Sequence, residues 1–589
     1  MECRRQLDLA GSAAAGRRLI GLATSLLLIC AFLPGQEQSP PNTDRIPSIK
    51  QLFAQERWQE MVERIEPALP TAGPTGRAEL QYYLGIALAR LERWDDARKA
   101  FRAGYDLQPS DKRFPIELAG VDFKQKRYPQ AAAWLGRALR LDPHDSYAND
   151  FLGTVYFLQG NLEAALKYWN RGGKPEIENV RPAPHLRVDP ALLDRAFAFS
   201  PASTLRLPDL LTSEARVRNL EIFPRYAFQL AAREDGKFDV DFHAQERNGW
   251  GSNTREGLFS LFRGIFQQTL HPEFFNLRQS AVNLVSLVRW DAQKRRALVS
   301  ISGPLRRDPQ WRYRVAVDLR NENWDIRDSF AGPAPLRGAL NLRREAISAG
   351  VTSVNSGRWS WSTGAEFSHR DYRSVFTGSA LTPEVLLAGN QLKHLGQLNY
   401  ELLRVPERRF VANATVSSQA GRIWSQPAHA FLKLQSSLAG HWFPRAEGDD
   451  FEIHARIGAG KTFGEVPFDE LFMLGLERDN DLWLRAHVGT RDGRKGSAPL
   501  GRNYLLANWE LDKNIYNNSL FSVKLGPFLD SGKITDSSPG LGSQKWFWDT
   551  GVQAKVFTLG VGVVFSYGKD LRSGNNAFYV RIGRSDRQN

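Results

Sequence analysis

The chain has little of the sulfur chemistry that many secreted proteins rely on. Only two cysteines, Cys3 and Cys30, and three methionines occur among its 589 residues. Both cysteines lie within the first 35 residues, so we expect no disulfide, reactive thiol or zinc–thiolate site in the rest of the protein. Beyond Gly251 the chain also lacks an apolar run of the roughly 20 residues that a membrane-spanning helix needs.

Sequence signatures of catalysis are missing as well. The basic stretch DGRKGSAPLG at 492–501 has glycines but neither the G-x-x-x-x-G-K-[S/T] spacing of a phosphate-binding loop nor a helix after it. No Gly-x-Ser-x-Gly elbow occurs. Five histidines are dispersed along the chain without cysteine or HExxH-type companions: His243, His271, His429, His441 and His487. We therefore expect no enzyme, no cofactor and no metal site.

The first 35 residues have the pattern of an export signal. Arginines, among them Arg17 and Arg18, precede the apolar run LIGLATSLLLICAFL, and the helix-breaking pair Pro34–Gly35 follows it. We expect cleavage near Gln36. Lipidation at Cys30 is the alternative, which the bulky Ile29 before it disfavours.

The net charge of +14 invites an interpretation as a nucleic-acid-binding protein. Basic residues are scattered along the chain rather than gathered in one tract, however. In an exported protein, anionic lipid or acidic saccharide is the expected partner, and we expect no nucleic acid.

A period of 34 residues dominates residues 45–180. Three successive units place two small residues and one large apolar residue at the same offsets: Gly85, Ala97 and Phe101; Ala119, Ala131 and Leu135; Gly153, Ala165 and Trp169. We expect paired helices that approach closely at the small residues, with the large residues filling the seam between units. The stretch 51–69 aligns less well and is interpreted as a degenerate cap.

This array resembles the tetratricopeptide repeat family. The resemblance implies a concave surface that binds a peptide or protein partner. A spacer or a dimerisation arm is the alternative.

A compact pattern occupies residues 190–250, after a proline-containing linker. RAFAFSP at 195–201 is interpreted as a strand, 204–212 and 213–223 as two short helices, and 226–248 as a hairpin that turns at Asp235–Gly236. The order β-α-α-β-β resembles a POTRA domain, the periplasmic module that precedes outer-membrane barrels of the BamA/TamA type.

Alternating residues characterise 255–589. In WRYRVAVDL at 311–319, every second residue from Trp311 is apolar, and the residues between are small or charged. Eleven of the 16 tryptophans fall between Trp290 and Trp548, as expected for the interfacial girdles of a transmembrane β-barrel. The 335 residues give sixteen strands of about 21 residues each, turns included. We expect a multidomain protein: an α-solenoid, a small α+β domain and an antiparallel transmembrane barrel.

Two motifs near the end of the chain resemble the BamA/TamA and two-partner-secretion superfamily. There, a long loop folds back into the barrel, and an arginine in its hydrophobic-Arg-Gly-aromatic tip meets an aspartate in a Phe-x-Asp-x-Gly strand. The matching residues of this chain are Leu484, Arg485, Ala486 and His487 in the tip, and Phe528, Asp530 and Gly532 in FLDSG. The resemblance implies a lumenal ion pair between Arg485 and Asp530.

Ala486 and His487 depart from the glycine and the aromatic residue of that tip, which leaves the tightness of its turn open. Asp530 shares its parity with Ser522 and Lys524, the polar face of the strand, so we expect it to point into the lumen. A solvated position at a strand end is the alternative.

The resemblance implies a location in the outer membrane of a diderm bacterium, with the repeats and the POTRA-like module in the periplasm. The expected function is assistance in the insertion or translocation of other proteins. The expected partners are outer-membrane lipid, lipopolysaccharide, and periplasmic partners or client barrels. The alternative is a passive pore or secretion channel whose repeats act as a scaffold.

Overall fold

The computed structural model describes residues 45–247, 268–327, 335–444, 450–517, 521–536, 545–558 and 561–584, together with the single residues 258, 261, 264, 265 and 541. The expected export signal at 1–35 lies outside them. The chain divides into two compact units, and the division runs through a small three-stranded sheet.

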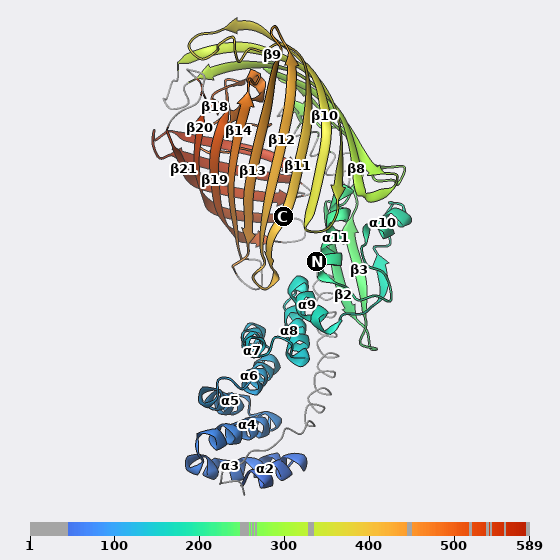
Figure 1. Ribbon diagram of the computed structural model, residues 1–589, viewed down its shortest axis with the longest axis vertical. Helices are drawn as coiled ribbons and strands as arrows, with labels where there is room; N and C mark the ends of the chain where they lie inside the picture. Colours follow the sequence, from blue (N-terminus) through green and yellow to red (C-terminus); the bar gives the residue numbers. More distant parts are fainter. Residues whose placement is uncertain are drawn as a thin grey trace. The chain divides into compact units, whose positions relative to one another are not determined.

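The first unit begins with antiparallel helix pairs (Figure 1). Its elements are α2 (Arg45–Ala54), α3 (Trp58–Ile65), η1 (Glu66–Thr71), α4 (Pro74–Arg90), α5 (Trp94–Leu107), α6 (Arg113–Lys124), α7 (Tyr128–Leu141), α8 (Ser146–Leu158) and α9 (Leu162–Trp169). Side chains of the residues just before two helices cap them: Asp145 accepts from the N–H of Ala148 at 2.8 Å, and Asn161 from that of Ala164 at 3.1 Å.

The large residues of the repeats lie against the small residues of the facing helix. A Cβ atom on Gly85 would lie 2.5 Å from the ring of Phe101, and one on Gly153 would lie 2.4 Å from that of Trp169. Each glycine and its aromatic partner belong to the two helices of one repeat. Phe101 and Trp169 therefore pack against the small residue of their own unit, and their expected place in the seam between units stays a prediction. Between units, Phe114 of α6 lies against Gly104 of α5.

The module after the repeats keeps the predicted order of elements but not their positions. Its elements are β1 (Ile177–Pro182), α10 (Pro190–Ala196), α11 (Leu207–Asn219), β2 (Arg225–Ala232) and β3 (Phe238–Gln245), with strand order β1-β3-β2. The strand predicted at 195–201 is wrong, because Asp189 caps a helix there that starts at Pro190. The two predicted helices at 204–223 are one, α11, and the first strand lies in the supposed linker.

The second unit is dominated by a closed antiparallel barrel. Its strands are β4 (Thr269–Leu270), β5 (Glu273–Leu277), β6 (Val282–Trp290), β7 (Lys294–Leu305), β8 (Asp308–Arg327), β9 (Leu336–Val354), β10 (Trp359–Phe376), β11 (Gly389–Val405), β12 (Phe410–Trp424), β13 (His429–Trp442), β14 (Phe451–Gly464), β19 (Asn503–Asn517), β20 (Phe521–Thr535), β21 (Phe547–Thr558), β22 (Val561–Asp570) and β23 (Asn576–Arg584) (Figure 1). The expected sixteen strands stay a prediction, because residues 248–257 and other gaps lie outside the described chain.

Alternation along the strands separates an apolar outer face from a polar inner one. Val315, Val317 and Leu319 of β8 are 38%, 42% and 44% exposed, whereas Arg312 of the same strand is 4% exposed. Exposed large apolar side chains continue around the barrel: Ile347, Phe367, Leu392, Leu402, Leu434, Ile457, Leu505, Leu525, Val552 and Phe565. A surface band of this extent marks an interaction with an apolar environment. Among the helices of the described chain, none is both long and apolar enough to cross a membrane.

Helix α11 is tied to one end of the barrel by the barrel's own arginine. The guanidinium of Arg312 donates to the carbonyl oxygens of Asn219 and Leu220 at 2.7 and 3.0 Å, where α11 ends. A cation there satisfies carbonyl groups that the helix leaves unpaired and complements its dipole. The Nδ2 atom of Asn283 donates to Leu220 as well, at 3.1 Å. We call this the helix-bearing end of the barrel.

The first prediction concerns repeat packing in the fragment 45–180, which we expect to fold alone because each repeat depends on its neighbours. Phe101→Ala should lower the free energy of unfolding by about 3–5 kcal/mol, because the fully buried ring leaves a cavity against Gly85. Urea unfolding followed by circular dichroism measures this. Lys99→Ala on the same helix is the control and should change the free energy by less than about 0.5 kcal/mol. Equal losses would contradict the assigned packing.

The second prediction concerns pH. Burial raises the pKa of the Glu117 carboxyl on α6 to about 7, although Tyr82 donates to it and arginines lie near. The folded repeats then bind a proton that the unfolded chain releases, so the free energy of unfolding should rise as pH falls from about 7 towards the ordinary value near 4.3. Glu117→Gln should flatten this slope between pH 8 and 5.5, and the exposed Glu63→Gln should not. An unchanged slope in Glu117→Gln would refute the shift.

Candidate functional site

The connection between β14 and β19 folds back into the barrel. It spans 465–502 and contains η4 (Phe468–Glu470), β15 (Phe472–Met473), β16 (Thr490–Arg491), β17 (Arg494–Lys495) and β18 (Leu500–Gly501). Asn480 holds its bend, because its Nδ2 atom donates to the carbonyl oxygens of Met473, Gly475 and Leu482 at 2.9, 2.7 and 3.1 Å. We call residues 465–502 the inner loop.

Arg485 lies at the tip of the inner loop and is 1% exposed. The structure brings it to Asp530 of β20: Nε donates to Oδ2 at 2.8 Å, Nη2 to Oδ1 at 2.6 Å, and the backbone N–H of Arg485 to Oδ2 at 3.0 Å. Nη1 donates to Glu510 at 2.6 Å and to Gln553 at 2.9 Å. The guanidinium carbon lies 3.9 Å from the ring centre of Phe528. All three guanidinium nitrogens therefore have acceptors, as a buried cation requires.

Asp530 is itself fully buried and points into the barrel. It also accepts a hydrogen bond from Nδ2 of Asn508, on the neighbouring strand β19, at 2.7 Å. The carboxylate therefore has a partner on each side, so the alternative of a solvated strand-end position is wrong.

The tip forms a tight turn with the residues that depart from the family pattern. The backbone N–H of His487 donates to the carbonyl oxygen of Leu484 at 3.1 Å, and Ala486 needs no left-handed conformation. The N–H of Ala486 donates to Oδ2 of Asp549 at 2.7 Å, and Nδ1 of His487 lies 3.0 Å from the same oxygen. The imidazole of His487 meets the ring of Phe547 edge-on, with 5.1 Å between ring centres. His487 thus makes an aromatic contact at the family's aromatic position.

Glycines in the barrel wall make room for the tip. A Cβ on Gly568 of β22 would lie 2.5 Å from the carbonyl oxygen of Arg485. One on Gly532, the last residue of FLDSG, would lie 3.3 Å from a methyl carbon of the fully buried Leu484. The motif glycine therefore has a packing role beside the aspartate.

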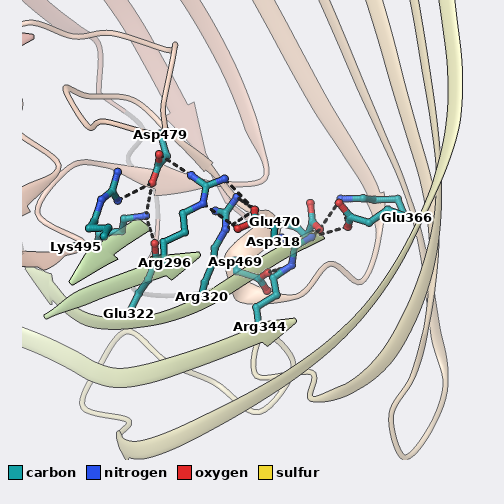
Figure 2. A network of polar contacts seen from close by, with 12 residues as sticks. Arg296, Asp318, Arg320, Glu322, Arg344, Glu366, Asp469, Glu470, Asp479 and Lys495 are labelled. Atoms are coloured by element: carbon teal, nitrogen blue, oxygen red, sulfur yellow. Dashed lines mark hydrogen bonds and ion pairs between the residues drawn. The ribbon is translucent and has the colours of Figure 1, made fainter. Parts of the chain in front are cut away.

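A second anchor lies on the opposite arm of the inner loop. Nζ of Lys495 donates to Glu322 of β8 at 2.7 Å and lies 3.5 Å from Asp479 of the loop. Asp479 also pairs with Arg296 of β7 at 2.8 Å, and Arg296 with Asp318 of β8 at 2.9 Å (Figure 2). The loop therefore forms ion pairs with the wall through a basic and an acidic side chain.

A third anchor lies near the start of the loop, where Asp469 and Glu470 meet a basic part of the wall. Glu470 accepts from Nζ of Lys393 on β11 at 2.8 Å, and Asp469 lies 3.1 Å from Nη1 of Arg370 on β10. Arg344 of β9 forms ion pairs with both of these carboxylates and with Glu366 (Figure 2). The basic wall thus neutralises the acidic pair.

The second and third anchors and the partners Glu510, Gln553 and Asp549 were not predicted from the sequence. Parity along β19 gives a signal for Glu510, because Asn508 and Asp512 share its polar face. No comparable signal marks Asp469 or Glu470, which lie in a loop. The expectation that the histidines are dispersed is wrong for His441, which lies beside His454 and Glu452.

Comparisons with known proteins match different parts of the chain. Residues 54–112 and 88–153 each match a tetratricopeptide repeat family model, which confirms the predicted array. No curated protein matches the chain by sequence.

Three solved structures of low sequence identity are similar to 69–70% of this chain. They are BamA from Haemophilus ducreyi lacking POTRA domains 1-3 (13% identity, TM-score 0.42, 69% of this chain and 84% of that chain), CdiB from Escherichia coli (12%, 0.45, 70% and 75%) and CdiB from Acinetobacter baumannii (10%, 0.41, 69% and 73%).

The third prediction is a double-mutant cycle on Arg485 and Asp530. Arg485→Ala should destabilise the barrel by about 3–5 kcal/mol, because it leaves buried carboxylates without a partner. Asp530→Ala should cost less, since Glu510 remains beside Arg485. The double variant should cost clearly less than the sum of the two. The measurement is the temperature at which the faster gel mobility of the unheated, folded barrel is lost.

The exposed pair Arg343–Glu345 on β9, with 2.7 Å between its charged atoms, is the matched control. Its cycle should give a coupling of no more than about 0.5 kcal/mol. Additive effects at Arg485 and Asp530 would mean that the two residues do not interact in the folded protein.

Proposed function

We propose that the protein is an outer-membrane β-barrel of the BamA/TamA superfamily that assists the insertion or translocation of other proteins. Its repeats and POTRA-like module face the periplasm in this proposal and bind partners or clients. The observation that carries it is the anchored tip of the inner loop, with Arg485 held by Asp530 inside the barrel.

The apolar outer face supports the proposed membrane location. Apolar side chains on the outside of every long strand would destabilise a protein in water, whereas lipid tails accept them. The described strands close into a barrel, in which the last strand adjoins the first, and closed barrels can satisfy their backbone groups in lipid. Lipid and lipopolysaccharide are accordingly the proposed surroundings of the barrel.

The helix-bearing end is the proposed periplasmic end. Short turns connect the strands there, such as Ser356–Arg358 between β9 and β10, and Gly357 donates its N–H to Thr212 of α11 at 3.0 Å. The inner loop leaves the barrel wall at the opposite end, which faces outward in this arrangement.

The proposed mechanism uses the seam between the first and last strands of the barrel. The strands that meet there are short: β4 and β5 hold two and five residues and β23 nine, whereas β8 holds twenty. Fewer hydrogen bonds have to break at such a seam than elsewhere in the wall, and an opened strand edge can template an incoming strand. No nucleotide, redox or hydrolytic step enters this mechanism.

A passive pore or secretion channel is the competing function. Charged residues on the inner wall favour it, because such walls line aqueous channels. The inner loop opposes it, since its tip and both arms occupy the lumen and are held by ion pairs at three places.

The fourth prediction separates the two functions in liposomes that contain the purified protein. A denatured outer-membrane barrel should fold faster into these liposomes than into protein-free ones, and single-channel conductance should be low. The variant Arg485→Ala/Asp530→Ala should lose the acceleration, because a loosened loop no longer fixes the barrel. The control Arg343→Ala should retain it.

A passive channel gives a different result. Folding of the client would then proceed at the protein-free rate with either protein, and conductance would be high and ion-selective in the unmodified chain. Recovery of the protein in the soluble periplasmic fraction of cells would contradict both functions.

A further inference from the structure

Two histidines and a glutamate meet at the helix-bearing end of the barrel. His441 is the last residue but one of β13. It lies directly opposite His454 of β14, and His454 follows Glu452 by two residues. Antiparallel alternation places the β13–β14 connection at the same end as the β9–β10 turn. We call these three residues the His-Glu-His cluster.

The ligand atoms of the cluster converge on one point. Nε2 of His441 and Nε2 of His454 lie 2.8 and 2.7 Å from the same oxygen, Oε1 of Glu452. The two imidazoles are stacked, with 4.4 Å between ring centres and 2° between their planes. Register between the strands fixes this arrangement, because His441 and His454 are directly opposite each other.

The cluster faces the lumen rather than the apolar outside. Ile457 of β14 is 57% exposed on the outer face, and Glu452, His454 and Arg456 have the opposite parity. Nζ of Lys524 on β20 contacts the other carboxylate oxygen of Glu452, Oε2. This contact passes over β19, which lies between β14 and β20.

Two imidazole nitrogens and one carboxylate oxygen are a ligand set for zinc and similar divalent transition metals. Bond lengths of about 2.0–2.1 Å and tetrahedral angles require ligand atoms about 3.3 Å apart. The present separations are about 0.5 Å shorter, a difference that small rotations of exposed ring edges absorb. The three ligand atoms all lie within 4.8 Å of one another, so no strand has to move.

The two stacked rings lie in parallel planes, so one of them has to turn about its side-chain bonds for both Nε2 atoms to face a single ion. A cation between the two nitrogens and Oε1 would take the place of the hydrogen-bonding contacts that now join these atoms. Lys524 would keep Oε2, as outer-shell partners of metal-bound carboxylates do, although its charge opposes the cation.

We propose that the His-Glu-His cluster is a binding site for one Zn²⁺ or a similar divalent transition metal, with a fourth position open to water or to a passing side chain. The ion would join β13 to β14 beside the helix-bearing mouth of the lumen. This site depends only on the barrel and is independent of the proposed transport function.

The fifth prediction tests the site in the full-length chain, purified without a polyhistidine tag and folded in detergent. Titration with Zn²⁺ against a chromophoric chelator should show one site, and Co²⁺ should give the visible absorption of a low-coordinate nitrogen and oxygen site. His454→Gln and Glu452→Gln should each weaken affinity by at least about tenfold, the size that loss of even an outer-shell partner brings. Lys524→Met should tighten binding, because it removes a positive charge beside the ion.

His394→Gln on β11 is the control, since this histidine lies on the outer face together with Leu392, away from the cluster, and contacts only Thr363 among the interactions described for it. It should bind Zn²⁺ like the unmodified chain. A measurement without any substitution covers the case of misfolded variants: Zn²⁺ should protect His441 and His454, but not His394, from acylation by diethyl pyrocarbonate, read residue by residue by mass spectrometry.

Two results would overturn the proposal. One is a Zn²⁺ affinity of the His441→Gln/His454→Gln chain equal to that of the unmodified chain. The other is equal acylation of His441 and His454 with and without the metal. Either would leave the cluster as a hydrogen-bonded ion pair between Glu452 and its neighbours.

Discussion

A buried guanidinium is the constraint on which the barrel interior depends. Arg485 is nearly inaccessible to water, and each ion removed from water costs several kcal/mol unless its hydrogen bonds are replaced. Asp530, Glu510 and Gln553 replace them, and Phe528 covers the guanidinium face. These partners come from three adjacent strands, β19, β20 and β21, so the loop tip can be satisfied only after the strands have assembled in register.

The remaining anchors extend the same principle along the inner loop. Lys495 reaches β8, and Glu470 reaches β11, on parts of the wall far from Asp530 in the sequence. A loop held at separated points by opposite charges is stiffer than one held at a single point, and each broken pair exposes a buried charge. Apolar packing holds the loop as well, because Phe468 and Leu471 belong to one buried cluster with Trp324, Leu342 and Phe431 of the wall.

The sequence predicted those elements whose residues follow a periodic or alternating pattern. The 34-residue period located the helix pairs, and the alternation in β8 gave both faces of the wall, because burial acts on each position separately. Elements without a period were misplaced: the end of α10 was predicted to be the start of a strand, since a helix of seven residues carries little signal. Contacts such as Glu470 with Lys393, or His441 with His454, depend on which strands become neighbours, and residue spacing alone does not contain that information. Arg485 with Asp530 was accessible only through resemblance to a family.

Accessibility of the loop tip in intact cells tests the central claim most directly. A cysteine placed by Ala486→Cys should resist a membrane-impermeant maleimide, since Ala486 is 9% exposed, while Thr377→Cys in an exposed connection should react quickly. Mass spectrometry separates both sites from Cys3 and Cys30. Adding Asp530→Ala should make the cysteine at 486 reactive, because the tip then loses its carboxylate. Equal and rapid labelling at 486 and 377 without that change would contradict an inner loop held in the lumen by Arg485.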